Sequence, residues 1–467
     1  MRKRSQKLAY ARAVPSHSRP RPRSGKRHQL RHRLIIVLAL VLFSGAAALF
    51  IRQSVLSAYS VAHQNASAQA QGTCAQQDAY RYYTLKQSGG FVLARAGGGS
   101  SGQPLGTPQA LARFGNDFGQ LESDAVFSMQ LSPDGCYLAI DGATDHDEQV
   151  WVFDTRHMSL TPVPANVSGN FLNWLPAGNS SLGKNGHTFL YRPMMPLGPG
   201  APLVNGAWNP GLWIVDAATG QIRNIDIHMS PAFLVDAAPS PDGSRIVYAT
   251  SYGTGMGSDA WMMSGDGSHQ SRLFHLAGGA QSIAGLFAWS PDGSMIAYER
   301  LSDSPVPFQP AGLWVMSSSG TASRRLADTD GGHGFTLAWS PDSGYIAYVA
   351  RTNVGDRAAD YNAQSLQSGV AMVNVASGAS RIVATPALTG VQINDNPKWI
   401  ASSGNLSITF TAYNPFNLVL GGSPRYWSAF VGADLSRPGA SGLMMPQAGA
   451  QLVPLSPVMS HVVAIGG

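Results

Sequence analysis

The 467-residue sequence has only two cysteines, and charged residues make up only 12% of it. Two cysteines exclude a scaffold held by many disulfides and any metal site built from several thiolates. The sequence also lacks a Gly-x-Ser-x-Gly nucleophile elbow, a His-Glu-x-x-His motif and a P-loop, and its twelve histidines show no zinc-ligand spacing. We therefore assign no catalytic residue, metal ligand or cofactor from the sequence.

Acidic residues are absent from residues 1–33, which hold 12 of the 32 Lys and Arg residues. The remaining chain holds 20 Lys and Arg against 26 Asp and Glu, so its net charge is −6. An acidic body with a basic tail is not typical of a nucleic-acid-binding domain, and we expect no nucleic-acid partner. The tail has no apolar periodicity, so we expect a disordered cytoplasmic segment that contacts anionic lipid.

Residues 34–51 are 18 uncharged, mostly apolar residues bordered by basic residues on both sides. That length is about the minimum for a helix that spans a bilayer core. The basic tail places the N-terminus in the cytoplasm and the body outside. We therefore expect a single-pass signal anchor in the cell membrane, followed by a short stalk over residues 52–74. A cleaved signal peptide is the alternative, since small-x-small patterns occur within residues 66–70.

Export of the body would place Cys74 and Cys136 in an oxidising compartment, where a disulfide can persist. With two cysteines there is only one pairing to consider. The alternative is two separate thiols, with Cys136 packed in a strand. The sequence leaves this choice open.

A repeat of about 50 residues organises the body. Its first element is a Ser-Pro-Asp turn between two apolar runs, found at Ser132, Ser240, Ser290 and Ser340. Pro and Asp favour such turns, and Gly provides a positive φ. Its second element is an apolar run with a central Trp, as in residues 313–316. Four short antiparallel strands per repeat predict a β-propeller blade, with the Trp side chains packed between blades.

The spacing of the repeats predicts the number of blades. Ser240, Ser290 and Ser340 lie 50 residues apart, whereas Ser132 lies 108 residues before Ser240. The longer interval accommodates a degenerate copy at residues 173–176.

Another degenerate copy begins at Pro397-Lys398-Trp399. We expect residues 455–465 to supply two strands of a last blade and residues 81–85 and 91–95 to supply the other two. A blade shared between the termini closes the ring and removes its open edges. These features predict seven blades, or six if one degenerate copy is incomplete.

These motifs resemble the TolB-like, or PD40 (WD40-like), β-propeller repeat, with its Trp-Ser-Pro-Asp-Gly hairpin at residues 289–293 and its Leu-Trp-Val-Met strand at residues 313–316. The resemblance covers residues 75–467 and implies an all-β propeller. It implies no single activity, because the same repeat occurs in periplasmic scaffolds and in gating domains of serine peptidases. The short stalk leaves no room for the N-terminal α/β domain of TolB, and we expect no peptidase domain.

The connections between second and third strands are predicted to form the binding face, because loop length that a fold does not require usually reflects function. The opposite face, with the Ser-Pro-Asp turns, is expected to have short connections throughout. The predicted long connections are residues 142–149, 192–211, 251–259, 301–312, 351–369 and 414–425. The candidate binding residues are Asp145, His146, Asp147, Glu148, Trp208, Asp356, Arg357, Tyr361 and Phe416.

The polar run from Asp145 to Glu148 offers carboxylate and imidazole ligands for a divalent cation, but a solvated loop rim is the interpretation we favour. Asp356, Arg357, Asp360 and Tyr361 form another polar loop, for which we also favour a solvated loop over a functional site. The apolar loops that contain Trp208 and Phe416 are expected either to contact a protein or lipid surface or to plug the ring.

We therefore expect a membrane-anchored extracytoplasmic propeller that binds a protein or cell-envelope component and has no catalysis of its own. Two alternatives remain open. One is a propeller hydrolase with its active site at the channel mouth, and the other is a transmembrane sensor that signals to the basic tail.

Overall fold

A computed structural model shows a body built almost entirely of β-strands, within one compact unit that spans Phe50–Gly467. The structure describes residues 74, 80–87, 90–98, 104–113, 121–144, 148–178, 186–197, 210–228, 232–253, 255–302, 311–330, 337–362, 365–402, 405–413, 425–433, 452–456 and 459–464. The predicted tail and the apolar segment 34–51 lie outside these residues. Within the described part of the chain, no helix is long and apolar enough to span a bilayer.

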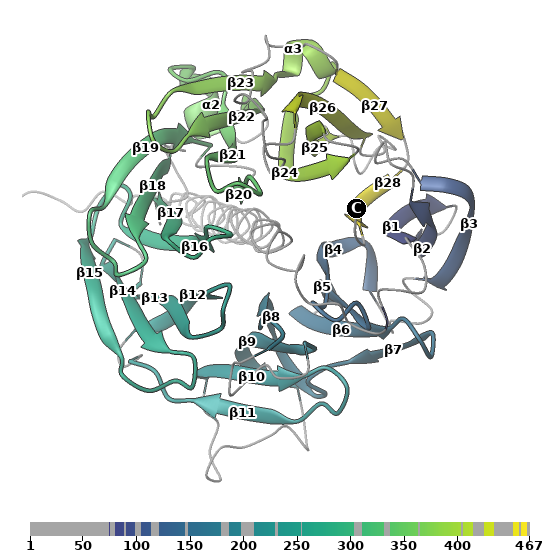
Figure 1. The fold of residues 1–467 in the computed structure, drawn as a ribbon, viewed down its shortest axis with the longest axis horizontal. Coiled ribbons are helices and arrows are strands. Elements are labelled where there is room, and N and C mark those ends of the chain that lie inside the picture. Colours follow the sequence, from purple (N-terminus) through teal and green to yellow (C-terminus); the bar gives the residue numbers. More distant parts are fainter. Residues whose placement is uncertain are drawn as a thin grey trace, which may run out of the picture. The chain divides into compact units, whose positions relative to one another are not determined.

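The strands form seven antiparallel sheets of four strands each, which is consistent with a propeller (Figure 1). One sheet combines β28 (Met459–Ala464) with β1 (Tyr80–Gln87), β2 (Gly90–Gly98) and β3 (Pro104–Arg113). The next three are β4 (Leu121–Leu131), β5 (Tyr137–Thr144), β6 (Glu148–Asp154) and β7 (Ser159–Pro162); β8 (Val167–Trp174), β9 (Thr188–Pro196), β10 (Leu212–Asp216) and β11 (Ile222–Ile225); and β12 (Phe233–Pro239), β13 (Arg245–Ser251), β14 (Gly257–Ser264) and β15 (Ser271–Ala277).

The last three sheets are β16 (Ile283–Trp289), β17 (Met295–Leu301), β18 (Ala311–Ser317) and β19 (Arg324–Thr329); β20 (Leu337–Trp339), β21 (Tyr345–Arg351), β22 (Ser368–Asn374) and β23 (Ser380–Ala384); and β24 (Ile393–Ser402), β25 (Asn405–Tyr413), β26 (Arg425–Ala433) and β27 (Leu452–Ser456). Two short helices, α2 (Arg357–Tyr361) and α3 (Pro386–Thr389), lie in connections.

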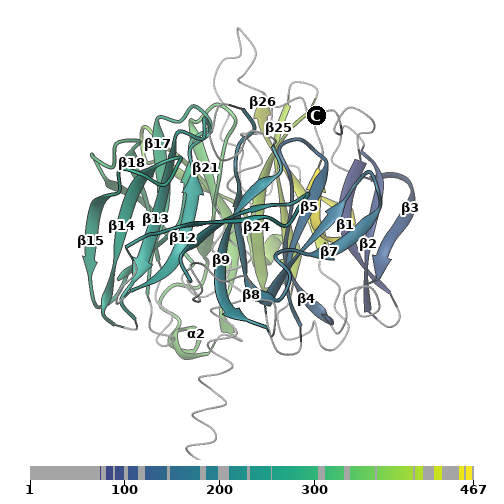
Figure 2. The ribbon, with the colours of Figure 1, turned by 90° about the horizontal axis from the view of Figure 1, so that it is seen from below.

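Antiparallel order gives each sheet two distinct ends (Figure 2). The first-to-second and third-to-fourth turns lie at one end, which we call the turn face. The second-to-third connections and the links to the next sheet lie at the other end, which we call the connection face. The helix α2 lies on the connection face.

The predicted Ser-Pro-Asp turns form through side-chain hydrogen bonds to the turn. The Ser290 hydroxyl donates to Asp292 Oδ1 at 2.5 Å and accepts from the Met295 backbone N–H at 2.9 Å, while Gly293 has a φ of 70°. Gly adopts this left-handed conformation without steric cost. The same Ser–Asp bond joins Ser132 to Asp134, Ser240 to Asp242 and Ser340 to Asp342.

Trp residues in the first strands join consecutive sheets, as the sequence predicts. Trp289 and Trp339 directly precede Ser-Pro-Asp turns, and Trp174 and Trp399 belong to the degenerate copies. Each indole N–H donates to a backbone carbonyl in the first strand of the preceding sheet. The bonds run from Trp174 to Gln130 (3.2 Å), from Trp289 to Ala238 (3.1 Å), from Trp339 to Ala288 (2.9 Å) and from Trp399 to Ala338 (2.9 Å). All four Trp residues are buried. Each Trp thus adds a directional bond to the apolar packing between sheets.

The β12–β15 sheet has Pro239 where its neighbours have this Trp. Here the bond runs in the opposite direction, because Asn173 Nδ2 of the β8–β11 sheet donates to the Ala237 carbonyl at 2.8 Å. Asn173, in the degenerate copy of the repeat, thus provides the polar link between these two sheets in place of a Trp.

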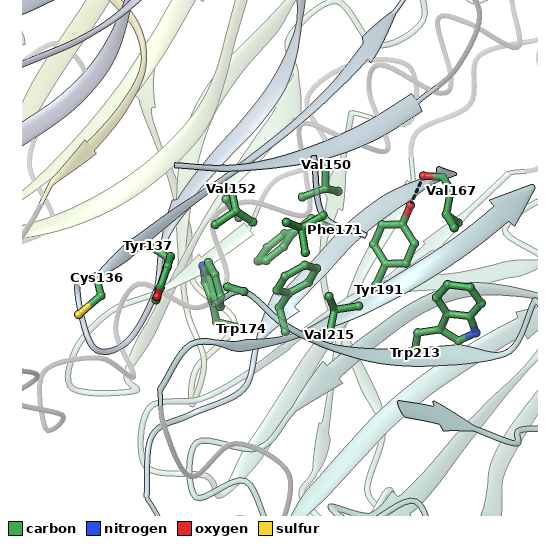
Figure 3. Packing of buried hydrophobic residues seen from close by; sticks show 14 residues of the cluster. Cys136, Tyr137, Val150, Val152, Val167, Phe171, Trp174, Tyr191, Trp213 and Val215 are labelled. Carbon is green, nitrogen blue, oxygen red and sulfur yellow. Dashed lines mark hydrogen bonds between the residues drawn. The ribbon is translucent and has the colours of Figure 1, made fainter. Parts of the chain in front are cut away.

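Apolar side chains fill the space between neighbouring sheets (Figure 3). Between the β4–β7 and β8–β11 sheets, Val150 packs in one cluster with Phe171, Trp174 and Tyr191. The Tyr191 hydroxyl donates to the Val167 carbonyl at 3.0 Å, so the buried polar end of this ring is satisfied.

The sheet that contains both termini differs from its prediction. One strand, β28, comes from the C-terminus and three come from the N-terminal part, whereas two from each were predicted. Residues 455–456 belong instead to β27, the fourth strand of the preceding sheet. Leu455-Ser456-Pro457 matches the start of a repeat turn, but no Asp-Gly follows, so the turn chemistry is absent.

Two predicted long connections are short. Only residues 145–147 separate β5 from β6, and only residues 252–256 separate β13 from β14. The polar residues at the ends of these strands were predicted to lie in loops. In the structure they continue the strand pairing, for example where Ser251 pairs with Ser258. The turn face also has long connections, contrary to prediction, at residues 175–187 and 434–451.

We predict that Trp289→Phe lowers the free energy of unfolding by about 1–3 kcal/mol, because it leaves the buried Ala238 carbonyl without its donor. Trp261→Phe is the matched control, since the buried Trp261 Nε1 has no hydrogen-bond partner among the described residues. Urea unfolding of both variants measures the difference. An equal loss in the two variants would show that the indole bond adds nothing to packing.

We predict that Gly293→Ala costs about 1 kcal/mol, because an L side chain is disfavoured at positive φ. The added Cβ would lie 3.9 Å from the nearest atom, of Pro241, so no clash contributes. Ser343 stands at the equivalent position with a φ of 60°, and its hydroxyl accepts from the Asp292 N–H at 3.2 Å. Thermal unfolding of Gly293→Ala measures the cost, and unchanged stability would contradict this explanation.

Candidate functional site: the connection face

Large hydrophobic side chains that remain exposed gather on the connection face. The structure describes ten such side chains, and eight of them lie there: Met194, Met195, Leu197, Phe233, Met256, Val354, Tyr361 and Leu388. The other two are Met158, in the turn after β6, and Ile382, within β23. Exposed apolar side chains that gather in one region are typical of interaction surfaces.

Five of the eight belong to the adjacent β8–β11 and β12–β15 sheets, and we call this group the apolar rim. It comprises Met194, Met195 and Leu197 at the end of β9, Phe233 at the start of β12, and Met256 in the turn between β13 and β14. Phe233 is 52% exposed and Met256 is 63% exposed. Methionine adapts its shape to a partner, and an aromatic ring offers a large contact area.

A buried polar network lies beside the apolar rim along the same strands. Arg192, two residues before Met194, donates from Nη2 to Asn170 Oδ1 at 2.5 Å and from Nη1 to the Val235 carbonyl at 3.1 Å. Asn170 Nδ2 in turn donates to Glu148 Oε2 at 2.6 Å. The network therefore connects three consecutive sheets and fixes β9 relative to β12.

Two further buried carboxyl groups belong to this network. Burial and the nearby charge of Glu148 raise the pKa of Asp141 well above its ordinary value, although the Arg192 charge opposes the shift. Burial raises the pKa of Asp236 to about 6 against opposing hydrogen bonds, among them one from the Phe287 backbone N–H at 2.7 Å. Both carboxyl groups are thus harder to ionise than ordinary aspartates, and Asp236 titrates near pH 6.

A second polar group lies in the β12–β15 sheet near the same face. Asp259 is buried and accepts hydrogen bonds from the Tyr252 hydroxyl at 2.5 Å and from His275 Nδ1 at 2.8 Å. Arg272 Nη1 lies 3.7 Å from the same carboxylate. The His275 side chain is half-exposed, so the carboxylate orients an imidazole toward solvent. This arrangement can donate or accept one hydrogen bond to a partner at the edge of the apolar rim.

The structure places the predicted site residues apart. Glu148 is the first residue of β6 and is buried, so the prediction of a solvated loop was wrong for this residue. Asp356 caps α2 by accepting from the Ala358 N–H, and the exposed Arg357 and Tyr361 lie on that helix. The remaining candidates, Asp145, His146, Asp147, Trp208 and Phe416, lie outside the described residues.

The connection that carries α2 is ordered by an ion pair. Arg351 at the end of β21 donates to Asp360 Oδ1 at 2.8 Å, and the Arg351 side chain is buried. Asp356, Arg357 and Tyr361 thus form a short helical insert that is attached to its sheet.

Sequence reasoning missed Asn170, Arg192 and Asp236. Asp236 could have been identified, because it is the single acidic residue in an apolar first strand, Phe-Leu-Val-Asp-Ala-Ala-Pro. Arg192 and Asn170 offered no such signal, because their pairing depends on strand register.

No cluster of His, Cys, Asp and Glu in the described residues has the arrangement needed to hold a metal ion. The hydrogen bonds of the polar network position strands, and the apolar rim, His275 and the α2 residues are exposed beside it.

The two cysteines form a disulfide between Cys74 and Cys136, with 5.1 Å between their Cα atoms. It is the pairing that the sequence left open. Cys136 follows Gly135 in the turn between β4 and β5, so the bond attaches the chain before β1 to the turn face of the neighbouring sheet.

No protein-family model and no curated protein matches the chain. Similar solved structures include TolB from Acinetobacter baumannii, with 15% identity over 65% of this chain and 62% of that chain and a TM-score of 0.39. They also include an oligogalacturonate lyase in complex with manganese (15% identity, 77% and 88% coverage, TM-score 0.48) and one from Vibrio parahaemolyticus (12%, 75% and 86%, 0.46). The match spans less than two thirds of TolB, and at these scores we draw no functional argument from any of the three.

We predict that Asp236→Asn changes the pH dependence of stability. The carboxyl titrates near 3.8 when unfolded and at about 6 when folded, so wild-type stability is complete below the unfolded value and falls as pH rises through about 6. At about 1.4 kcal/mol per pH unit, the fall reaches up to about 3 kcal/mol. Asn keeps the acceptor for the Phe287 N–H and should abolish this fall in urea unfolding between pH 4.5 and 7.5.

Asp292→Asn provides a control of opposite sign. Burial of Asp292 is outweighed by hydrogen bonds from Ser290 and Ser294, which hold its pKa below the ordinary value. Its contribution is therefore lost as pH falls, and its replacement should weaken the loss of stability at low pH. If wild type and Asp236→Asn show the same dependence of stability on pH, the Asp236 carboxyl does not cause the fall in stability as pH rises.

Proposed function

We propose that this protein is a membrane-anchored extracytoplasmic β-propeller that binds a protein or cell-envelope component on its connection face, without catalysis of its own. The observation that carries the proposal is the distribution of exposed large hydrophobic side chains, of which eight of the ten that the structure describes lie on one face. Binding surfaces typically combine such apolar anchors with a polar surround, and here the apolar rim adjoins the half-exposed His275.

A rigid support under the apolar rim favours a binding role. Arg192 joins Asn170 and Val235 across two sheets, and the rim residues begin directly beyond these contacts. Anchor residues on strand ends lose less conformational entropy on binding than residues on long loops. The polar network thus prepares the rim for a partner.

Charge favours a protein partner over a lipid surface at the rim. Peripheral lipid-binding surfaces place Lys and Arg around their apolar residues. After residue 51 the chain contains three lysines, of which Lys398 is buried, and 17 arginines, against 26 acidic residues. The body has a net charge of −6, so an anionic bilayer would repel it.

The location follows from the sequence and is supported by one structural feature. Residues 34–51 are proposed as the membrane helix, and residues 1–33 as a cytoplasmic tail that contacts anionic lipid and no nucleic acid. The Cys74–Cys136 disulfide supports an oxidising, extracytoplasmic environment for the body.

The finer architecture is also proposed. We infer that the seven sheets are seven blades of TolB-like type and that the sheet of β28, β1, β2 and β3 closes the ring. The recurrence of the Ser-Pro-Asp turn and of the indole bond in successive sheets supports this assignment.

Site-specific photo-crosslinking in intact cells tests the binding face. We predict that a photoreactive amino acid at Phe233 yields a specific protein or envelope adduct, whereas one at Met158, exposed on the turn face, yields none. In the otherwise unaltered protein, Phe233→Glu should weaken binding of the identified partner by roughly 30-fold, the effect of losing an anchor worth about 2 kcal/mol. Adducts at Met158 alone would contradict the proposed face, and lipid-only adducts at Phe233 would contradict a protein partner.

A further inference from the structure

Exposed methionines are concentrated in the apolar rim. The structure describes the exposure of ten methionine side chains, of which five are buried, one is partly buried and four are exposed. Three of the four belong to the rim, where Met256 is 63% exposed, Met195 49% and Met194 39%. The fourth, Met158 on the turn face, is 37% exposed. Within the described part of the chain, the rim therefore holds most of the thioether surface that solvent reaches.

The strand framework sets the exposure of two of these side chains. Met195 belongs to the β8–β9 ladder, where it pairs with Ser168. Met256 lies in the tight turn between β13 and β14, and its backbone N–H donates to the Gly253 carbonyl at 3.0 Å. Both residues are thus held by backbone hydrogen bonds of the sheets, and their side chains project from the ends of strands.

Methionine thioethers are the sulfur atoms of this chain that remain open to mild oxidation. The sequence has two cysteines, and both belong to the Cys74–Cys136 disulfide. Oxidation of methionine to the sulfoxide converts a flexible apolar side chain into a polar one, and it disrupts surfaces that are rich in methionine. The surface on which this chemistry has the largest effect is the apolar rim.

We propose that Met195 and Met256 are modification sites, at which a peroxide forms methionine sulfoxide and thereby weakens partner binding at the apolar rim. The effect on binding rests on the proposed function. The Sδ lone pair attacks one peroxide oxygen, and the O–O bond breaks. The attacked oxygen passes its proton to the departing hydroxide, so one water molecule is released. Sulfur is oxidised by two electrons, and the peroxide is reduced by two.

A sulfoxide changes what the rim offers to a partner. Its oxygen accepts hydrogen bonds from water in the free protein, and it loses them when an apolar surface covers it. A buried polar atom that lacks a hydrogen-bond partner weakens binding by about 10-fold. A bound partner covers these sulfur atoms, so oxidation acts on the unbound protein and then hinders binding.

Peptide mass spectrometry of the purified full-length chain during treatment with hydrogen peroxide tests the modification sites. Met195 and Met256 should form sulfoxide at least about 10-fold faster than the buried Met263 and Met316, whose sulfur atoms become accessible only through local unfolding. Equal rates at exposed and buried positions would overturn the assignment. The measurement requires no partner, so its outcome is independent of the proposed binding function.

Photo-crosslinking tests the effect on binding. The full-length chain with a photoreactive amino acid at Phe233 is oxidised, freed of peroxide with catalase and added to detergent-solubilised membranes of cells that lack the protein. The adduct yield should fall by about 10-fold or more relative to the untreated chain. The double variant Met195→Leu/Met256→Leu should lose most of this response to peroxide, whereas the matched control Met158→Leu should keep it.

Two results would overturn the effect on binding. They are an undiminished adduct yield after complete conversion of Met195 and Met256, and an equal response to peroxide in the double Leu variant. The comparison of treated and untreated wild type requires no Leu substitution, so it decides the question if the double variant fails to fold. Absence of an adduct from the untreated chain would contradict the proposed binding function and, with it, the effect on binding.

Discussion

The bond from an indole N–H to a carbonyl of the preceding sheet is the interaction on which the architecture depends. It recurs from Trp174, Trp289, Trp339 and Trp399, and each time it joins two first strands. A four-stranded sheet cannot bury both of its faces alone, so each sheet requires its neighbours. The bond sets the distance and orientation of neighbouring sheets. Between the β8–β11 and β12–β15 sheets the Asn173 bond to the Ala237 carbonyl takes its place, and there the strand ends of β9 and β12 come together.

Local chemistry explains why the fold could be predicted from the sequence. The Ser290–Asp292 turn needs only residues that are close in the chain, and so does the apolar run around Trp314. The degenerate copy at Asn173–Trp174 was also recognisable, because the interval between Ser132 and Ser240 requires a further copy, and its Trp makes the same bond. The composition of the sheet formed by both termini was predicted incorrectly, because the Leu455-Ser456-Pro457 segment matches a repeat turn in sequence only.

The candidate site could be predicted much less well, because its parts come from different sheets. Glu148 is polar and was expected in a loop, yet Asn170 from the next sheet satisfies it inside a strand. The choice between a solvated rim and a buried network depends on which side chains face each other across sheets. Met194 and Phe233 are far apart in sequence. The strands that carry them are held together by the bond from Arg192 to the Val235 carbonyl, and that bond depends on strand register.

We propose that a partner covers the connection face in the native membrane. Oxidative footprinting of methionines tests it most directly, because exposed Met side chains convert to sulfoxides that mass spectrometry can count. Met195 and Met256 lie on this face, and Met158 on the turn face is the internal reference. We predict slower oxidation of Met195 and Met256 in intact membranes than in the purified protein, with no change for Met158. Equal oxidation in both preparations would contradict the account.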